Sequence, residues 1–324
     1  MKKYLVTGGT GFIGSALVRR LLNEGNHVRV LDNGLRGNLG RLKDISSKIE
    51  MIEGDIREPK VVNEAIKGMD SVCHLAYLNG TEFFYTKPEL VLEIGVKGMI
   101  NVLDACVKER VRELIVASSS EVYQTPSKIP TDETISLSIP DPLNPRYSYA
   151  GGKIISELMA INYGRKYFDR VLIFRPHNVY GPDMGWEHVI PQFCLRMKEL
   201  CKKSKEMTVQ FPIQGSGNET RAFVFIEDFI SGLMYVINKG EHLGIYNIGT
   251  TEEININQVA KEVGSFFGKE IIIEPGKLAE GGTLHRCPDI SKLQKLGYVP
   301  GISFSQGLKM TAAWYDKNAN QKSK

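Results

Sequence analysis

The chain of 324 residues is about twice as long as one typical domain, which excludes a peptide, a lone binding module or a small disulfide-stapled scaffold. Hydrophobic residues make up 42% and charged residues 24%, as in globular proteins that bury sizeable cores. The formal net charge of +4 is mild, whereas nucleic-acid binders carry dense basic stripes, so we expect no nucleic-acid partner.

The first half of the sequence alternates short apolar runs with segments of helix length. This rhythm predicts an α/β fold in which a parallel sheet is covered by helices on both faces, a doubly wound domain of Rossmann type. The expected strands, in chain order, are residues 4–6, 27–31, 51–52, 71–75, 114–117 and 171–174.

After Phe174 the alternation loosens, and turn-forming residues separate shorter apolar segments. This change predicts a smaller α+β substrate-binding lobe that completes a cleft. We expect the Rossmann domain to span residues 1–176 plus about 222–245, and the lobe to span 177–221 and 246–316. Residues 317–324 are polar without apolar periodicity and are expected to form a disordered tail.

A glycine-rich turn, Thr7-Gly8-Gly9-Thr10-Gly11-Phe12-Ile13-Gly14, joins the first expected strand to a helix. Gly8, Gly11 and Gly14 let the backbone approach a pyrophosphate, and free N–H groups at the helix start attract its charge. Asp32 ends the second strand, 18 residues after Gly14, where it would bind an adenosine ribose and repel a 2′-phosphate. The sequence therefore predicts NAD rather than NADP as cofactor.

Further cofactor contacts are expected at the turn itself and at the ends of the next strands. The turn Gly54-Asp55-Ile56 follows the third strand and is a candidate cap for the adenine. Arg36 is expected to be a solvated loop residue, with a contact to a 2′-phosphate as the alternative. The additional cofactor residues that we predict are Phe12, Ile13, Asn33, Asp55, Ile56, Leu75 and Ala76.

Tyr149 and Lys153 are four residues apart, so on a helix they share one face. The ammonium can lower the pKa of the phenol, and a tyrosinate beside NAD⁺ is a suitable base for a sugar hydroxyl whose carbon loses a hydride. By itself such a pair usually means surface packing. Together with the glycine turn it predicts a catalytic pair.

Seven motifs follow one another along almost the whole chain: Thr7-Gly8-x-x-Gly11-x-x-Gly14, Ser118-Ser119-Ser120-Glu121-Val122-Tyr123, Tyr149-x-x-x-Lys153, Arg175-Pro176-His177-Asn178-Val179-Tyr180-Gly181-Pro182, Gly215-x-Gly217-x-x-x-Arg221-x-Phe223, Tyr246-Asn247-Ile248-Gly249 and Arg286-x-Pro288-Asp289. In this order they resemble the extended short-chain dehydrogenase/reductases, the NAD-dependent epimerase/dehydratase group that acts on nucleotide sugars. The resemblance implies that Ser119 and Tyr149 meet the reacting sugar oxygen and that Lys153 also holds the nicotinamide ribose. It further implies that the nucleotide-diphosphate sugar contacts Ser120, Asn178, Arg221 and Arg286.

The segment from Ser119 to Glu121 is the most informative about the reaction. The 4,6-dehydratases resemble Thr-Asp-Glu here, and Ser120 is a poor general acid in place of that aspartate, which disfavours dehydration. UDP-glucuronate decarboxylases resemble Thr-Ser-Glu and use an arginine in a segment similar to Arg286-Cys287-Pro288-Asp289, so decarboxylation stays open. UDP-glucose 4-epimerases need only the serine, the tyrosine and the lysine.

We therefore predict an NAD-dependent nucleotide-sugar 4-epimerase whose catalytic residues are Ser119, Tyr149, Lys153 and Glu121. The alternatives are a decarboxylase or dehydratase, a dehydrogenase acting at C4 through a 4-keto intermediate, and a catalytically silent regulator that binds NAD. The presence of the serine, tyrosine and lysine together argues against the silent regulator. Glu121 also has a simpler interpretation, as a cap for Tyr123 or a nearby N–H group.

Two positions depart from the pattern of the relatives, His177 before Asn178 and Gln124 after Tyr123. His177 is expected to pack with its ring N–H satisfied, and binding or protonation of a substrate group is the alternative. The run Gly185-Trp186-Glu187-His188 is expected to be a substrate loop rather than a metal site, because it offers too few ligands.

We expect a homodimer. Apolar residues lie on more than one face of two expected helices, the one from about Val91 to Glu109 and the one with Tyr149 and Lys153. The resemblance supports this expectation, because relatives commonly pair through these helices. No apolar stretch is long enough to span a membrane or to form a secretory signal, so no membrane partner and a cytoplasmic location are expected. The five scattered cysteines form no Cys-x-x-Cys pair, which indicates neither disulfides nor a metal.

Overall fold

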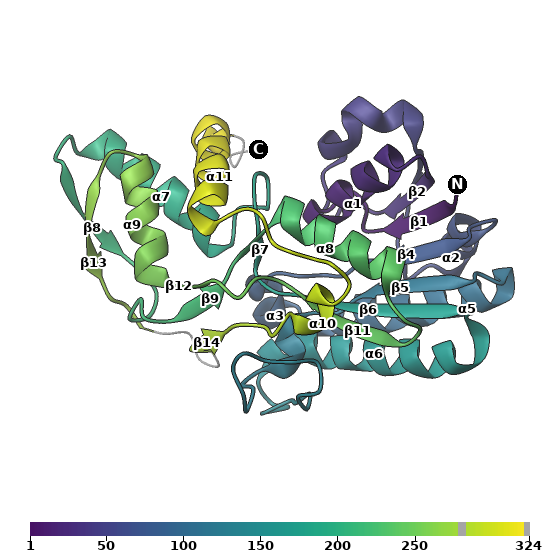
Figure 1. Ribbon diagram of the computed structural model, residues 1–324. Helices are drawn as coiled ribbons and strands as arrows, with labels where there is room; N and C mark the ends of the chain where they lie inside the picture. Colours follow the sequence, from purple (N-terminus) through teal and green to yellow (C-terminus); the bar gives the residue numbers. More distant parts are fainter. Residues whose placement is uncertain (278–282, 321–324) are drawn as a thin grey trace.

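A seven-stranded parallel sheet forms the centre of the larger domain in the computed structural model, which describes residues 1–277 and 283–320 (Figure 1). Its strand order is β11-β6-β5-β4-β1-β2-β3, so the α/β doubly wound fold is confirmed. The chain reverses its direction of winding between β1 and β4, which is where such folds bind their ligands. The strands are β1 (Lys3–Thr7), β2 (His27–Asp32), β3 (Glu50–Glu53), β4 (Ser71–His74), β5 (Glu113–Ala117), β6 (Arg170–Pro176) and β11 (Gly244–Ile248).

Helices cover both faces of this sheet, as the alternating sequence predicts. Successive strand residues point to opposite faces, so Leu5 and Val6 of β1 are both fully buried but belong to two different apolar cores. One face carries α1 (Phe12–Asn23) and α8 (Ile226–Lys239), and the other carries α2 (Pro59–Ile66), α5 (Gly98–Glu109) and α6 (Ser148–Tyr167).

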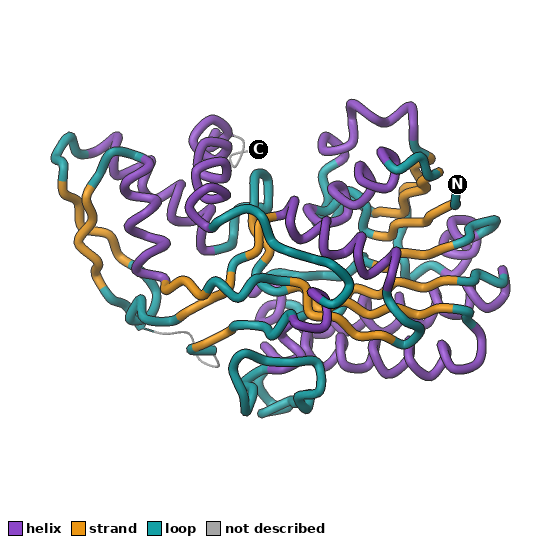
Figure 2. Tube along the Cα trace, in the orientation of Figure 1, coloured by secondary structure: helices purple, strands orange, loops and turns teal. Residues whose placement is uncertain are grey.

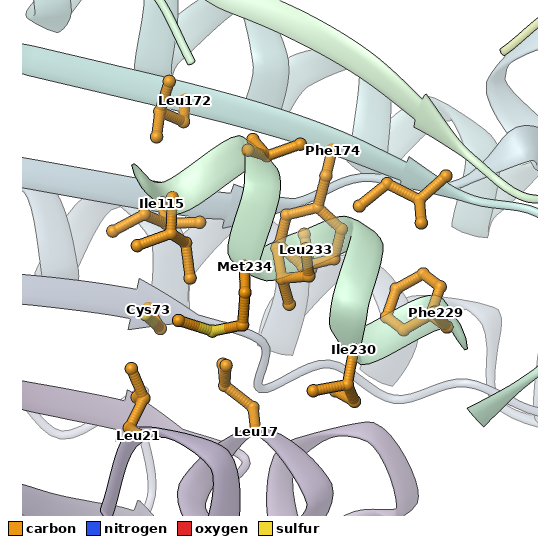
Figure 3. Packing of buried hydrophobic residues seen from close by; sticks show 14 of the residues in the cluster. Leu17, Leu21, Cys73, Ile115, Leu172, Phe174, Phe229, Ile230, Leu233 and Met234 are labelled. Carbon is orange, nitrogen blue, oxygen red and sulfur yellow. The ribbon is translucent and has the colours of Figure 1, made fainter. Parts of the chain in front are cut away.

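Helix α8 closes the first core although it comes from the second half of the chain. Figure 3 shows Phe229 and Leu233 of α8 close to Phe174 of β6, with Leu17 of α1 on the far side of the cluster. Burying such side chains contributes roughly 1.5–3 kcal/mol each, which fixes α8 against the sheet. The chain therefore returns to the sheet domain with α8, after its first passage through the lobe.

The domain boundary expected at residue 246 is wrong, because Tyr246 and Ile248 belong to β11. This edge strand pairs in parallel with β6, with Tyr246 opposite Phe174. The short helix α10 (Ser291–Gln294) also packs on this domain, where Leu293 joins the core of α8. Leu293 is the one apolar residue of α10, and its burial joins segments that are far apart in the sequence, which local sequence patterns do not reveal.

The predicted smaller lobe has its own core and stands beside the sheet domain (Figure 2). Several aromatic side chains pack in this core, where the rings of Tyr180, Phe223 and Phe304 are in mutual contact. The lobe contains the parallel pair β8 (Thr208–Pro212) and β13 (Glu270–Glu274), the strands β12 (Glu253–Asn255), β9 (Thr220–Ala222) and β14 (His285–Arg286), the pair β7 (Val179–Tyr180) and β10 (Val224–Phe225), and the helices α7 (Val189–Lys203), α9 (Ile256–Phe266) and α11 (Phe304–Asn318).

The tail that we expected to be disordered from residue 317 starts too early in the chain, because the structure is still helical there. Helix α11 continues to Asn318, so Lys317 and Asn318 are helical, because buried Ala312 and Tyr315 anchor the helix on the lobe and its last turn extends from them. Residues 321–324 lie outside the described residues. Within the described ranges, no helix is long and apolar enough to cross a membrane.

Candidate active site

A cleft between the sheet domain and the lobe begins at the carboxyl ends of the strands. The glycine turn after β1 forms its floor, where Gly8 has a φ of +72° and a Cβ would lie 2.8 Å from the backbone of Ala76. A Cβ at Gly14 would overlap the carbonyl oxygen of Gly8. Only glycine is accommodated at these two positions without a backbone shift. Gly11 caps α1 without a side-chain hydrogen bond, so the first N–H groups of the helix remain available for an anion.

Asp32 lies at the end of β2 and is held by two backbone N–H groups. Its carboxylate accepts hydrogen bonds from Thr10 N and Gly34 N, both at 2.9 Å. The two bonds fix a negative charge beside the glycine turn, in the position from which a ribose can be bound. The structure brings together the predicted cofactor residues Gly8, Gly11, Asp32, Asn33, Asp55, Ile56, Leu75 and Ala76 in one pocket, and Phe12, Ile13 and Gly14 line the adjoining cleft.

Asp55 is already engaged within this pocket. It forms an ion pair with Arg57 and accepts a hydrogen bond from Asn33 Nδ2, both at 2.9 Å. The bond to the Arg57 guanidinium is the largest of the effects that lower the pKa of Asp55. The carboxylate is therefore ionised and held at the rim of the pocket.

Two arginines join the loop after β2 to the loop after β7. Arg36 does not simply extend into solvent: its guanidinium forms an ion pair with Glu187 at 3.0 Å and lies over the ring of Phe83. Arg41 donates two hydrogen bonds to the carboxylate of Asp183 at 2.8 and 3.0 Å. The expected substrate loop, residues 185–188, thus connects the lobe side of the cleft to the cofactor side.

The predicted catalytic residues meet where β5 and α6 approach each other. Ser119 follows β5, and its hydroxyl accepts a hydrogen bond from Glu121 N at 3.1 Å. The side chain of Ser119 lies close enough to Tyr149 to favour the ionised phenol and so to lower its pKa. The ammonium of Lys153, one turn along α6, donates to Ala117 O at 2.7 Å and lies 5.8 Å from the centre of the Tyr149 ring.

Burial governs the titration of this pair. It raises the pKa of Tyr149, with the nearby side chain of Ser119 opposing, so the lowering that we expected from the ammonium does not prevail. Spacing along a helix places two side chains on one face, but it says nothing of how dry their surroundings are. Burial also lowers the pKa of Lys153 to about 7, and the negative charge of Glu157 opposes that change.

A cluster of three arginines surrounds Glu121. Arg286 donates to one oxygen of Glu121 at 2.6 Å, and Arg146 lies 3.9 Å from the other oxygen. Burial would raise the pKa of Glu121, but the charges of Arg286, Arg146 and Arg221 outweigh it and lower the pKa. Burial and the neighbouring Arg286 lower the pKa of Arg221 to about 10. Three guanidinium groups face the carboxylates of Glu121 and Glu219, so the cluster keeps a net positive charge, which suits an anion such as a diphosphate.

The other predicted substrate residues have different surroundings. Ser120 is buried and lines the cleft, as does Asn178, whose φ of +40° is left-handed and whose amide nitrogen has no partner among the described residues. His177 points away into the protein, with Nε2 3.1 Å from Asn247 Oδ1. Burial lowers its pKa to about 3, so it is neutral at physiological pH. Gln124 donates to Glu121 O at 2.7 Å and supports the turn that carries this acid.

Residues 4–249 match the family described as the NAD dependent epimerase/dehydratase family. The chain belongs to this family. The resemblance stated from the motifs is thus confirmed, and so is the dependence on NAD. Over the residues that the structure describes, no group of three or more His, Cys, Asp or Glu side chains is placed to hold a metal ion.

The similarity to individual members of the NAD-dependent epimerase/dehydratase family extends over nearly the whole chain. The sequence is 31% identical over 312 residues to UDP-glucuronic acid decarboxylase 6 of Arabidopsis thaliana, covering 94% of this chain and 86% of the relative. It is 32% identical over 322 residues to a putative UDP-glucose 4-epimerase of Methanocaldococcus jannaschii, covering 97% and 98%. The dTDP-glucose 4,6-dehydratase of Streptomyces venezuelae, solved with NAD bound, superposes with a TM-score of 0.86 at 29% identity and covers 98% of each chain.

Three residues beside the predicted catalytic group were not predicted from the sequence: Tyr77, Phe84 and Arg146. Tyr77 and Phe84 enclose Tyr149. The ring of Tyr77 meets that of Tyr149 edge to face, with centres 5.1 Å apart, and the ring of Phe84 stacks on it with centres 4.8 Å apart. Arg146, which adds the third guanidinium near Glu121, lies in a short 3₁₀ turn just before α6. Its place three residues before Tyr149 was a usable signal, whereas the positions of Tyr77 and Phe84 depend on how α3 (Thr81–Thr86) folds over the cleft.

Proposed function

We propose that this protein is a nucleotide-sugar 4-epimerase that uses bound NAD⁺. The observation that carries the proposal is the convergence of Ser119, Tyr149 and Lys153 beside the pocket of the glycine turn and Asp32. These residues form the smallest set that oxidation of a sugar alcohol requires. When bound, NAD⁺ accepts a hydride from C4 of the sugar and later returns it to the opposite face of the 4-keto sugar.

Each member of the set has one task in the proposed reaction. Tyr149 Oη takes the proton of the 4-hydroxyl as C4 loses its hydride, and it returns a proton when the hydride comes back. Ser119, which lies beside Tyr149, holds the same sugar oxygen. The Lys153 ammonium stabilises the tyrosinate, which burial alone would disfavour. The reaction therefore requires the charged form of Lys153, which predominates below its pKa of about 7.

The diphosphate of the nucleotide is assigned to the arginine cluster. Arg221 and Arg286 belong to adjacent strands of the lobe, where Arg286 pairs with Arg221 in the register of β14 and β9. Arg221 also donates to Thr283 O at 2.8 Å, which fixes its side chain at the rim. The net positive charge of the cluster supports binding of an anionic group such as a diphosphate. The lobe would thus hold the nucleotide while the sheet domain holds the cofactor.

Decarboxylation is the second candidate, and the contact between Arg286 and Glu121 favours it. Their hydrogen bond of 2.6 Å lies close to the predicted catalytic tyrosine. A sugar carboxylate that enters the cleft could therefore bind the Arg286 guanidinium in place of Glu121. The similarity to UDP-glucuronic acid decarboxylase 6 supports the same alternative. Dehydration has less support, because Ser120 supplies no acid to the leaving hydroxyl.

A panel of UDP-, GDP-, dTDP- and CDP-sugars, analysed by mass spectrometry and NMR, tests the proposal. Epimerisation leaves the mass unchanged and inverts the C4 proton couplings. Loss of carbon dioxide from a nucleotide-linked uronic acid would establish the second candidate, and accumulation of reduced cofactor would indicate a net dehydrogenase. Binding without any change of sugar or cofactor spectrum would instead favour the silent regulator.

A further inference from the structure

Tyr77 lies directly against the predicted catalytic pair, although it belongs to no motif of the sequence. It follows β4 closely, and its ring is perpendicular to that of Tyr149 at 83°, with centres 5.1 Å apart. The ammonium of Lys153 lies 4.0 Å from the centre of the Tyr77 ring. The phenol oxygen is buried and has no hydrogen-bond partner among the described residues.

Two glycines from different helices provide the space for this ring. A Cβ at Gly95, in the π-helical turn Glu93–Lys97 that precedes α5, would overlap the hydroxyl and two ring carbons of Tyr77. A Cβ at Gly152, in α6, would overlap only the hydroxyl and would lie 3.4 Å from the nearest ring carbon. The ring is thus locked between α5 and α6, and its hydroxyl fills the cradle without forming a bond.

We propose that Tyr77 is a positioning residue that holds the Lys153 ammonium between its ring face and the Ala117 carbonyl, in reach of Tyr149. The proposal rests on the proposed function, because only a reaction that uses Tyr149 as base needs the ammonium at that place. The face of an aromatic ring is the negative part of its quadrupole and attracts a cation, most strongly where water is excluded. Lys153 is 4% exposed, so this condition holds.

The other groups around Lys153 do not supply the same restraint. Glu157, one turn further along α6, favours the charged amine, but its carboxylate is engaged by Arg175 at 2.6 Å and by Ser118. His74 on β4 is kept neutral by burial, and the Lys153 ammonium further lowers its pKa. Tyr149 is neutral until it takes part in the reaction. The Ala117 carbonyl accepts one hydrogen bond from the ammonium. Of the two rings that the ammonium faces, Tyr77 is the nearer, at 4.0 Å against 5.8 Å for Tyr149.

Replacing the ring tests this role. In Tyr77→Leu we expect the alkaline limb of the pH profile for cofactor reduction to move to lower pH by about 0.4–1.5 units, because a cation–π contact favours the charged amine by that much. Tyr77→Phe should keep the wild-type profile, because the hydroxyl makes no bond. Phe168→Leu, which removes a ring from the same apolar core far from Lys153, is the matched control and should lower thermal stability without moving the profile.

The two glycines provide a second, geometric test. Gly152→Ala should slow cofactor reduction when Tyr77 is present, and adding Tyr77→Phe should restore it, because the hydroxyl is the only group that overlaps at that position. Gly95→Ala should not be rescued by Tyr77→Phe, because two ring carbons overlap as well. Rescue of both variants, or of neither, would contradict the placement of the ring.

A readout independent of turnover separates this inference from the proposed function. The ¹³Cε resonance of Lys153, assigned by its absence in Lys153→Arg, can be titrated by NMR without any sugar. A lower pKa in Tyr77→Leu than in wild type and Tyr77→Phe is expected even if no nucleotide sugar reacts. Equal Lys153 pKa values in wild type and Tyr77→Leu would overturn the inference, while failure of the sugar panel alone would overturn only the 4-epimerase.

Discussion

Replacing Glu121 by glutamine separates the two candidate reactions, because only one of them needs the negative charge at this position. Glutamine keeps the shape and one hydrogen-bond acceptor but no longer balances the guanidinium groups of Arg286, at 2.6 Å, and Arg146, at 3.9 Å. The net positive charge of the arginine cluster rises by one unit, which should strengthen binding of the diphosphate rather than weaken it. If Tyr149 is the only base, product formation should fall modestly, by less than about 10-fold.

If the enzyme decarboxylates, the same substitution should be far more severe. Glu121 would then orient the carboxyl-bearing carbon or carry a proton, and loss of such a group costs roughly 10²–10⁴-fold in rate. The assay is stopped-flow absorbance of the reduced cofactor combined with chromatography of the sugar product. Tyr149→Phe serves as the reference, because every route begins with loss of the 4-hydroxyl proton. Normal cofactor reduction with loss of product in Glu121→Gln would refute the 4-epimerase reasoning.

Three further predictions concern the cofactor and the assembly. Freshly purified protein, denatured and analysed by mass spectrometry, should release NAD(H), and a preference for NADP would contradict the role of Asp32. Arg41→Ala should lose NAD on gel filtration faster than wild type, because its ion pair with Asp183 joins the loops on the two sides of the cleft; equal retention would show that this pair does not hold the cofactor. We propose a homodimer through the exposed apolar residues Ile155 and Leu158 of α6. Light scattering should find a dimer, and Leu158→Glu should convert it to a monomer. A monomeric wild type at micromolar concentration would contradict the proposed dimer.

The parts of the structure that the sequence predicted are those governed by local pattern. Apolar runs predicted the first six strands. The glycine spacing predicted the turn, and the charge of Asp32 at the end of the second strand predicted its place beside that turn. Tyr149 and Lys153 were found because helical geometry fixes side chains at a spacing of four. Strand β11 escaped prediction because it joins the sheet only after the chain has passed through the lobe, and the helical conformation of Lys317 and Asn318 depends on the packing of Ala312 and Tyr315 in the lobe core.

The electrostatics of the site could not be predicted in the same way. The pKa of Tyr149 depends on burial by Phe84 and Tyr77, and neither residue is near it in the sequence. The guanidinium of Arg286 reaches Glu121 across a separation of 165 residues. Such contacts are set by packing between α3, α6 and the lobe, so they become visible only once the domains are placed together.

The proposed function requires that bound NAD⁺ transiently oxidises a nucleotide sugar with Tyr149 as base. Stopped-flow absorbance during a single turnover tests it most directly, using the sugar that the panel identifies. Reduced nicotinamide should appear on mixing and disappear as product forms, and Tyr149→Phe should abolish the signal while still binding the sugar. Product formation by the wild type with no reduced nicotinamide at any time, or an undiminished signal in Tyr149→Phe, would contradict the account.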